Sequence, residues 1–134
     1  MTKKDVDKIS YNVIGAAIAV HRELGPGLAE AMYHKCMLKE LGLRKMKFET
    51  EHPVEVEYKG EKVQSDMRCD ILVEDTVIVE LKATAIIPLF EAQLLTYMKL
   101  LQKPKGVLIN FNCHNIFKFG QRTMVNEYYR KLTG

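Results

Sequence analysis

Apolar residues recur at three- and four-residue steps over the first 24 residues of the chain. This spacing puts them on one face of a helix, so residues 6–24 are predicted to form an amphipathic helix. Gly25-Pro26-Gly27 ends the pattern, and a second helical pattern covers residues 28–41, with Gly42 as its expected terminator. The core face of this second helix is predicted to hold Met32, Cys36 and Leu41. The first third of the chain is therefore predicted to be a helical hairpin.

The period changes to two after Lys47. Apolar residues alternate with charged ones at Val54, Val56 and Tyr58, as in a strand with one solvent face, and Lys59-Gly60 predicts a tight turn into a strand over residues 61–65. Two further strands are expected over residues 68–73 and 76–82, joined at Glu74-Asp75. The side chains of the second of these alternate between the faces of the sheet: Val77, Val79 and Leu81 on one, and Ile78, Glu80 and Lys82 on the other.

A third helix is predicted over residues 88–102, because Pro88 suits the first turn and an apolar stripe follows it. Strands are expected over residues 106–111 and 116–119, and a helical turn or two within residues 126–134. This order is neither a strict βα repeat nor all-β. It predicts an α/β (α+β) fold in one domain over residues 1–134, with a mixed β-sheet flanked by helices.

The composition narrows the class of protein. The chain has 134 residues, of which 47% are hydrophobic and 28% charged, as in a globular domain. A net charge of +3 is compatible with nucleic acid but does not require it. Three widely spaced cysteines without a C-x-x-C pair argue against a disulfide scaffold or a zinc knuckle. With neither a signal-peptide core nor a membrane-length apolar run, the expected location is the cytoplasm.

Charged residues at the end of an apolar strand need a partner, because an unpaired buried charge costs several kcal/mol. Glu80 and Lys82 end such a strand and share one face. A hairpin centred on Glu74-Asp75 would bring Asp70 nearly opposite Glu80. Two facing carboxylates repel unless a hard cation neutralises them, and oxygen ligands favour Mg²⁺ or Mn²⁺. The alternative for Glu80 and Lys82 is a structural salt bridge at the strand end.

The D…ExK arrangement of Asp70, Glu80 and Lys82 resembles the PD-(D/E)xK nuclease superfamily. The resemblance implies a restriction-endonuclease-like fold in which Asp70 and Glu80 bind Mg²⁺ and Lys82 orients or deprotonates the attacking water. It also implies that the carbonyl of Leu81 is a further metal ligand.

Residues 27–33 read G-x-x-E-x-x-Y and follow Val20-His21-Arg22-Glu23-Leu24-Gly25-Pro26. This pattern is similar to that of the GxxExxY proteins, a small branch of the same superfamily. The likeness implies that Glu30 is another metal ligand and that Tyr33 supports the site. The alternatives are a favourable charge at a helix N-terminus for Glu30 and a core position for Tyr33.

Gln93-x-x-x-Tyr97 is similar to a motif of RecB-like exonucleases and stacks both side chains on one helical face. They are expected to line the same cleft as Glu80 and to support it or the nucleic acid. The alternatives are a structural amide at Gln93 and a core tyrosine at Tyr97. Arg68, two residues before Asp70, is the basic residue most favoured for contact with phosphate.

The first hypothesis for function is a Mg²⁺-dependent nuclease that cuts DNA, or less favourably RNA, with Mn²⁺ as an alternative cation and a homodimer as an option for cutting both strands. The second is a catalytically inactive module on the same fold that binds nucleic acid or protein. A third is a phosphate-binding structural protein within a larger assembly.

Overall fold

The computed structural model describes residues 1–134, beginning with the helices α1 (Lys3–Leu24) and α2 (Glu30–Leu43). Thr2 and Asp5 form a capping box at the start of α1, so the helix begins before its apolar stripe does. Gly25 ends α1 with a φ of 67°, which glycine adopts without the steric cost of a side chain. The predicted helical hairpin is confirmed.

Five strands form one mixed sheet in the order β1-β4-β5-β6-β7. Their bounds are β1 (Phe48–Pro53), β4 (Arg68–Val73), β5 (Val77–Lys82), β6 (Lys105–Asn110) and β7 (Gln121–Val125). β5 and β6 are parallel and are connected by α3 (Pro88–Leu101), whereas the other neighbours are antiparallel. The structure is therefore the predicted α/β fold, with a mixed sheet and flanking helices.

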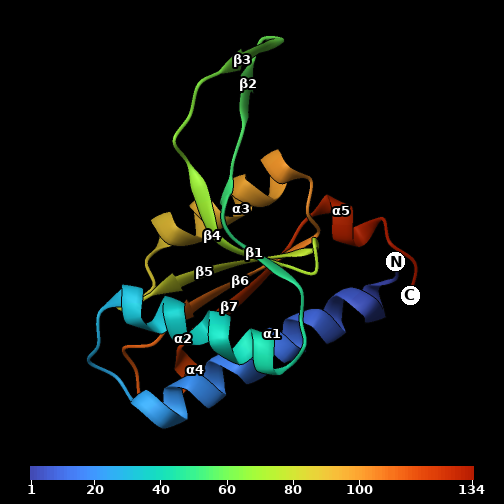
Figure 1. The fold of residues 1–134 in the computed structure, drawn as a ribbon. Helices are drawn as coiled ribbons and strands as arrows, with labels where there is room; N and C mark the ends of the chain where they lie inside the picture. The colour runs from blue at the N-terminus through green and yellow to red at the C-terminus, as the bar shows by residue number, and fades with distance from the viewer.

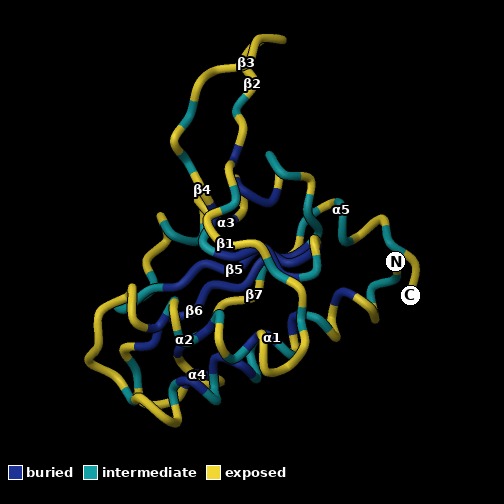
Figure 2. The backbone as a smooth tube through the Cα atoms, in the orientation of Figure 1, coloured by how far each residue is buried: buried dark blue, intermediate teal, exposed yellow.

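Helices cover both faces of the sheet (Figure 1), with α1 and α2 on one face and α3 on the other. Val77, Val79 and Leu81 pack into the core beneath α1 and α2, and Ile78 packs beneath α3. Every residue of β6 is buried, and the deepest part of the backbone runs through β5 and β6 (Figure 2). The predicted division of the faces of β5 is confirmed.

A two-stranded arm, β2 (Val56–Tyr58) and β3 (Glu61–Val63), projects from the sheet between β1 and β4 (Figure 1). The alternating residues Val56 and Tyr58 thus belong to this arm, while buried Val54 lies in the connection. β1 itself was not predicted. It is an edge strand with no fully buried residue, so its sequence carries little alternation.

The predicted strand over residues 116–119 is wrong, because this segment is the short helix α4 (Ile116–Phe119). The Asn115 side chain caps it by accepting a hydrogen bond from the Lys118 backbone N–H. The strand lies further on, as the edge strand β7. A final helical turn, α5 (Glu127–Arg130), confirms the prediction for the C-terminal segment.

The predicted core face of α2 is confirmed at Leu41 and is wrong by one residue at the other two positions. Tyr33, Met37 and Leu41 are buried, whereas Met32 is 45% exposed and Cys36 is half-buried. The aromatic ring of Tyr33 sets this face by stacking on Phe111, with 4.4 Å between ring centroids. Gly42 lies inside α2, which ends one residue later.

Candidate active site

Asp70 and Glu80 lie where β4 and β5 leave their ladder. The last paired residues there are Ile71 and Val79, so the next opposing pair is Asp70 and Glu80. The backbone N–H of Asp70 donates to Glu80 Oε2 at 2.9 Å, and that of Leu81 donates to Asp70 Oδ2 at 2.8 Å. Each carboxylate thus takes a backbone N–H of the opposite strand, and the predicted convergence of the two acids is confirmed.

Glu80 is buried, with only 6% of its surface exposed. Burial, followed by the nearby charge of Asp70, raises the pKa of Glu80 to about 9. Two carboxyl groups in this arrangement cannot both ionise cheaply without a cation. The pair therefore forms a site that favours either a bound proton or a bound metal ion.

Lys82 extends from the last position of β5 and is half-buried. Its Nζ lies 4.3 Å from the centroid of the Phe90 ring, a cation–π contact with the start of α3. No ion pair within 4 Å involves Lys82, so the alternative of a salt bridge with Glu80 is wrong. The ammonium group therefore contacts the Phe90 ring but forms no ion pair with either acid.

Glu30 is the first residue of α2. Partial burial raises the pKa of its carboxyl, which the charge of Lys82 opposes and that of Asp70 reinforces. Glu30 therefore lies within electrostatic range of Lys82 and Asp70, and its role as a metal ligand stays a prediction. Its position at a helix N-terminus also satisfies the alternative reading, because the helix dipole favours an acidic residue there.

Tyr33 holds the loop that leads to Glu30. Its hydroxyl donates to the carbonyl of Gly25 at 2.6 Å and accepts from the backbone N–H of Leu28 at 3.1 Å. The side chain is fully buried, so it cannot contact nucleic acid. The core position is the correct reading for Tyr33, whose hydroxyl also bonds the loop before α2.

Gln93 and Tyr97 occupy successive turns of α3. Tyr97 is buried, and burial together with the charges of Glu80, Cys69 and Asp70 raises its pKa, which places the phenol beside the acidic pair. The side chain of Gln93 is exposed. Tyr97 is therefore buried on the side of the acidic pair, while the Gln93 amide faces solvent one turn away.

Arg68 and Leu81 flank the two acids. Arg68 is exposed, and its guanidinium donates to the carbonyl of Glu51 at 3.4 Å. The Leu81 side chain lies in the core, while its backbone N–H binds Asp70.

His34 and Glu51 lie near Asp70, and no pattern in the sequence pointed to either residue. One ligand atom from each of His34, Glu51 and Asp70 lies within 4.8 Å of the others. Glu51 has a φ of 52°, and the regular alternation of β4 breaks opposite it: Cys69 packs beneath α3 and Ile71 beneath α1 and α2. No motif spacing links these three residues, because they come from α2, β1 and β4.

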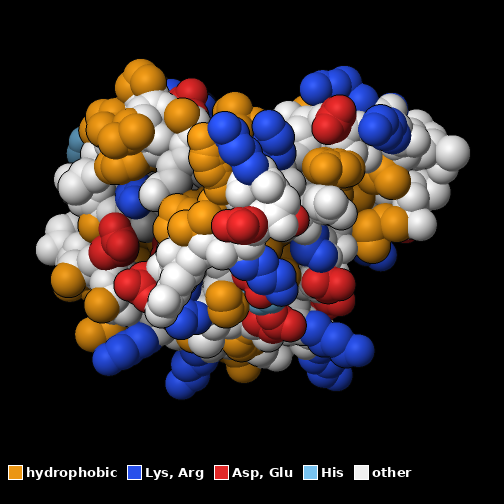
Figure 3. Space-filling model, turned by 90° about the horizontal axis from the view of Figure 1, so that it is seen from above, with side chains coloured by type: hydrophobic (Ala, Val, Ile, Leu, Met, Phe, Trp, Pro, Cys, Tyr) orange, Lys and Arg blue, Asp and Glu red, His pale blue; other side chains and the backbone are white.

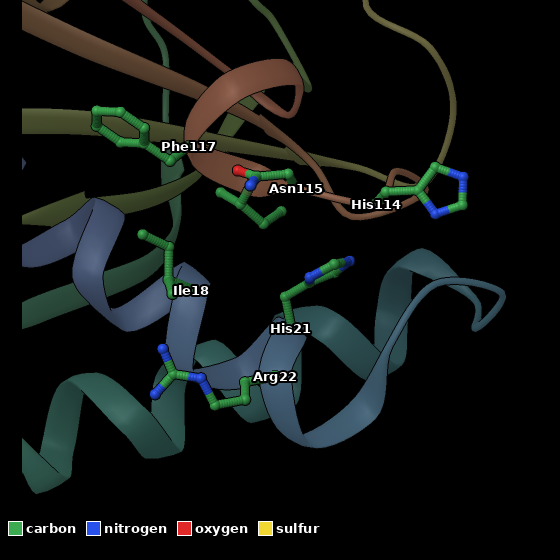
Figure 4. A pocket seen from close by; sticks show the side chains of 7 residues that line it. Ile18, His21, Arg22, His114, Asn115 and Phe117 are labelled. Carbon is green, nitrogen blue, oxygen red and sulfur yellow. The ribbon is translucent and has the colours of Figure 1, made fainter.

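The charged surface seen from above is mixed. On this side of the molecule, Lys and Arg side chains are scattered among Asp and Glu and form no continuous basic face (Figure 3). A separate polar pocket of about 270 Å³ lies between the end of α1 and the start of α4 (Figure 4). There His21 donates from Nε2 to the carbonyl of Cys113 at 2.8 Å, which ties α1 to the loop after β6.

Comparison with known families agrees with this geometry. A family model of the PD-(D/E)XK nuclease superfamily matches residues 7–123. The chain belongs to this superfamily. The matched segment runs from α1 into β7 and contains Asp70, Glu80 and Lys82. No curated protein and no solved structure matches the chain.

PD-(D/E)XK nucleases typically use divalent metal ions, and the acidic residues here fit such an ion. One oxygen of each of Asp70 and Glu80 accepts a backbone N–H, and neither carboxylate has an ion-pair partner within 4 Å. Glu80 is buried and Asp70 is half-buried, so both can offer oxygen ligands. Glu30 senses the charge of Asp70, but the ligand atoms of Glu30, Asp70 and Glu80 do not all lie within 4.8 Å of one another. No helix is both long and apolar enough to cross a membrane.

Proposed function

We propose that this protein is a Mg²⁺-dependent nuclease that hydrolyses phosphodiester bonds in DNA. The observation that carries the proposal is the reciprocal bonding of Asp70 and Glu80 at the end of the β4–β5 ladder, with Lys82, which forms no ion pair, on the same strand as Glu80. Membership of the PD-(D/E)XK nuclease superfamily supports a nucleic-acid substrate. Within that superfamily, the GxxExxY pattern favours placing the chain in the branch of that name.

Each group of the site has a proposed role. Asp70, Glu80, Glu30 and the carbonyl of Leu81 would hold the cation, which when bound neutralises phosphate charge and makes water more acidic. Lys82 orients the attacking water or accepts its proton, a role that arginine could not take because it stays charged. Tyr97 would limit the contact of the two acids with solvent, because its phenol is buried and senses the charges of Glu80 and Asp70.

Exposed residues near the acids would bind the substrate. Arg68 presents a guanidinium two residues from Asp70, and Gln93 presents an amide on the exposed side of α3. Both can donate hydrogen bonds to phosphate oxygens. Because one site cuts one strand, cleavage of both strands of a duplex would use two copies of the chain.

The proposal is tested by cleavage assays on single-stranded, duplex and branched DNA and on RNA, with Mg²⁺, Mn²⁺ or EDTA. Glu80→Gln and Lys82→Met are each expected to lower the cleavage rate by about 100-fold or more, because the first weakens cation binding and the second removes the group beside the water. The matched control is Lys4→Met, which changes an exposed lysine near the start of α1 and should cleave like the wild type.

Equal cleavage by the wild type and both site variants would mean that the activity belongs to a contaminant. Saturable DNA binding without cleavage, unaffected by EDTA, would instead support the non-catalytic binding module. Faster cleavage of RNA than of DNA would overturn the proposed substrate but not the site.

A further inference from the structure

A second group of metal-ligating side chains lies against Asp70, made by His34 of α2 and Glu51 of β1. One ligand atom from each of the three residues falls within 4.8 Å of the others. Ligands on opposite sides of a first-row divalent ion are about 4.2 Å apart, since each bond is about 2.1 Å long. The three ligand atoms therefore lie close to the spacing that one shared ion requires.

The imidazole of His34 is oriented by a hydrogen-bond chain. Thr50 Oγ1 donates to the carbonyl of Asp70 at 3.5 Å and lies 2.9 Å from His34 Nε2. Because the Thr50 hydroxyl donates its proton to the Asp70 carbonyl, its oxygen accepts a hydrogen bond from the Nε2–H of His34. The other ring nitrogen of His34, Nδ1, then carries the lone pair. Metal-ligating histidines typically donate their other ring N–H to a neighbour in this manner.

The free nitrogen of His34 faces a carboxylate. Nδ1 lies 3.7 Å from Glu51 Oε1, beyond hydrogen-bond distance. When the imidazole is neutral, its Nδ1 lone pair and the carboxylate oxygen repel each other at this separation, and a cation between them removes the repulsion. Asp70 completes the group with a carboxylate whose Oδ2 is already bound by the Leu81 N–H.

We propose that His34, Glu51 and Asp70 form a binding site for a divalent transition-metal ion such as Mn²⁺, adjacent to the acidic pair and sharing Asp70 with it. The imidazole nitrogen gives the site its selectivity, because nitrogen ligands suit transition metals better than Mg²⁺. The site deepens the proposed function by naming a second cation beside the first, and it rests on that function only for its role in cleavage.

Binding of Mn²⁺ alone to the full-length protein tests the site without any substrate. Pulsed electron paramagnetic resonance should detect ¹⁴N coupling from an imidazole ligand in the wild type. His34→Gln should abolish this coupling and weaken Mn²⁺ binding in calorimetry by about tenfold or more. Mg²⁺ binding should change by less than about twofold, because oxygen ligands dominate the other site.

Two matched controls separate ligand loss from general damage to β1. His52→Gln and Glu49→Gln alter a histidine and a glutamate of the same strand outside the three-residue group, and both should keep the ¹⁴N coupling. Glu51→Gln should weaken Mn²⁺ binding as His34→Gln does, which keeps the test decisive if the histidine variant fails to fold.

The two proposals fail in different ways. Absence of ¹⁴N coupling in the wild type, or its persistence in His34→Gln, would overturn the second site and leave His34 and Glu51 as an ion pair only. Glu80→Gln should retain the coupled Mn²⁺ while losing Mg²⁺ binding. A wild type that shows the coupling but cleaves no nucleic acid would support this site and contradict the nuclease.

Discussion

At the scale of single residues, the environment of Glu80 determines whether its carboxyl carries a proton or faces a cation. The sequence alone identified Glu80 and its partners Asp70 and Lys82, because charged residues at the end of an apolar strand stand out from the pattern. The burial of Glu80, which raises its pKa, depends on the packing of α3 and could not be predicted from the sequence of the strand.

Glu80→Gln should make the stability of the cation-free protein less dependent on pH. The folded pKa of Glu80 is raised from 4.5 to about 9, so its stabilising contribution is complete below about pH 4.5 and is lost as pH rises toward 9. Glutamine does not ionise. In thermal unfolding with EDTA, the melting temperature of the variant relative to that of the wild type should therefore rise steadily from pH 5 to 9.

Exposed Glu57 in the arm provides the control, since Glu57→Gln should follow the wild-type pH dependence. Parallel pH profiles for the wild type and Glu80→Gln would contradict the burial argument. Saturating Mn²⁺ should reverse the order of stability at pH 8, because the cation stabilises the ionised wild-type pair.

Tyr33→Phe should destabilise the fold by about 1–2 kcal/mol, because the variant leaves the Gly25 carbonyl and the Leu28 N–H without their partner. The stacking on Phe111 is kept, so the loss is confined to the loop before Glu30. Urea unfolding measures the change, with Tyr11→Phe as the control because Tyr11 is 78% exposed. An unchanged midpoint would mean that the hydroxyl does not hold the loop.

At the scale of elements, the helices and central strands followed the hydrophobic pattern closely. The turn between β4 and β5 was expected at Glu74-Asp75, and both residues adopt a positive φ of 51° there. Edge strands were harder: β1 and β7 were missed, and α4 was taken for a strand. β1 and β7 have no buried residue and α4 spans only four residues, so the periodicity of these segments is weak.

Gly106→Ala should destabilise the protein by about 1–3 kcal/mol through overpacking between β6 and α3. A Cβ at this position would lie 2.7 Å from Leu94 Cδ1 and 2.8 Å from Met98 Sδ. Gly42→Ala is the matched control, since nothing lies within 4 Å of its Cβ position. Within α2 that change should be stabilising by about 0.5–1 kcal/mol. Equal effects of the two variants in urea unfolding would refute this account of the contact.

At the scale of the whole molecule, a cluster near the chain ends joins three elements. Asp7 of α1 accepts hydrogen bonds from Lys105 of β6 at 2.8 Å and from Tyr129 of α5 at 2.9 Å. Lys105 is largely buried, so it depends on this partner. None of these residues is near another in sequence, and the cluster could not be predicted.

Asp7→Asn should cost about 0.5–1 kcal/mol, a small value because the Asp7 side chain is 49% exposed. The hydrogen bond from Lys105 and then that from Tyr129 lower the pKa of Asp7 below 3.8, against the opposing effect of burial. The contribution is therefore present above about pH 4 and is lost as pH falls further. Urea unfolding at pH 7 and pH 3 tests this, and a difference that grows at low pH would contradict the sign. Exposed Asp66→Asn is the control.

The sequence by itself determined the helical hairpin, the central strands and the register that sets Asp70 against Glu80. These follow from local periodicity and from one turn, which act over a few residues. The tertiary structure alone decided that His34 and Glu51 meet Asp70, that Tyr33 is buried and that Glu80 is shielded from water. Those contacts arise when α2 packs on the sheet and β1 pairs with β4, and no short-range pattern encodes the meeting of segments so far apart in the chain.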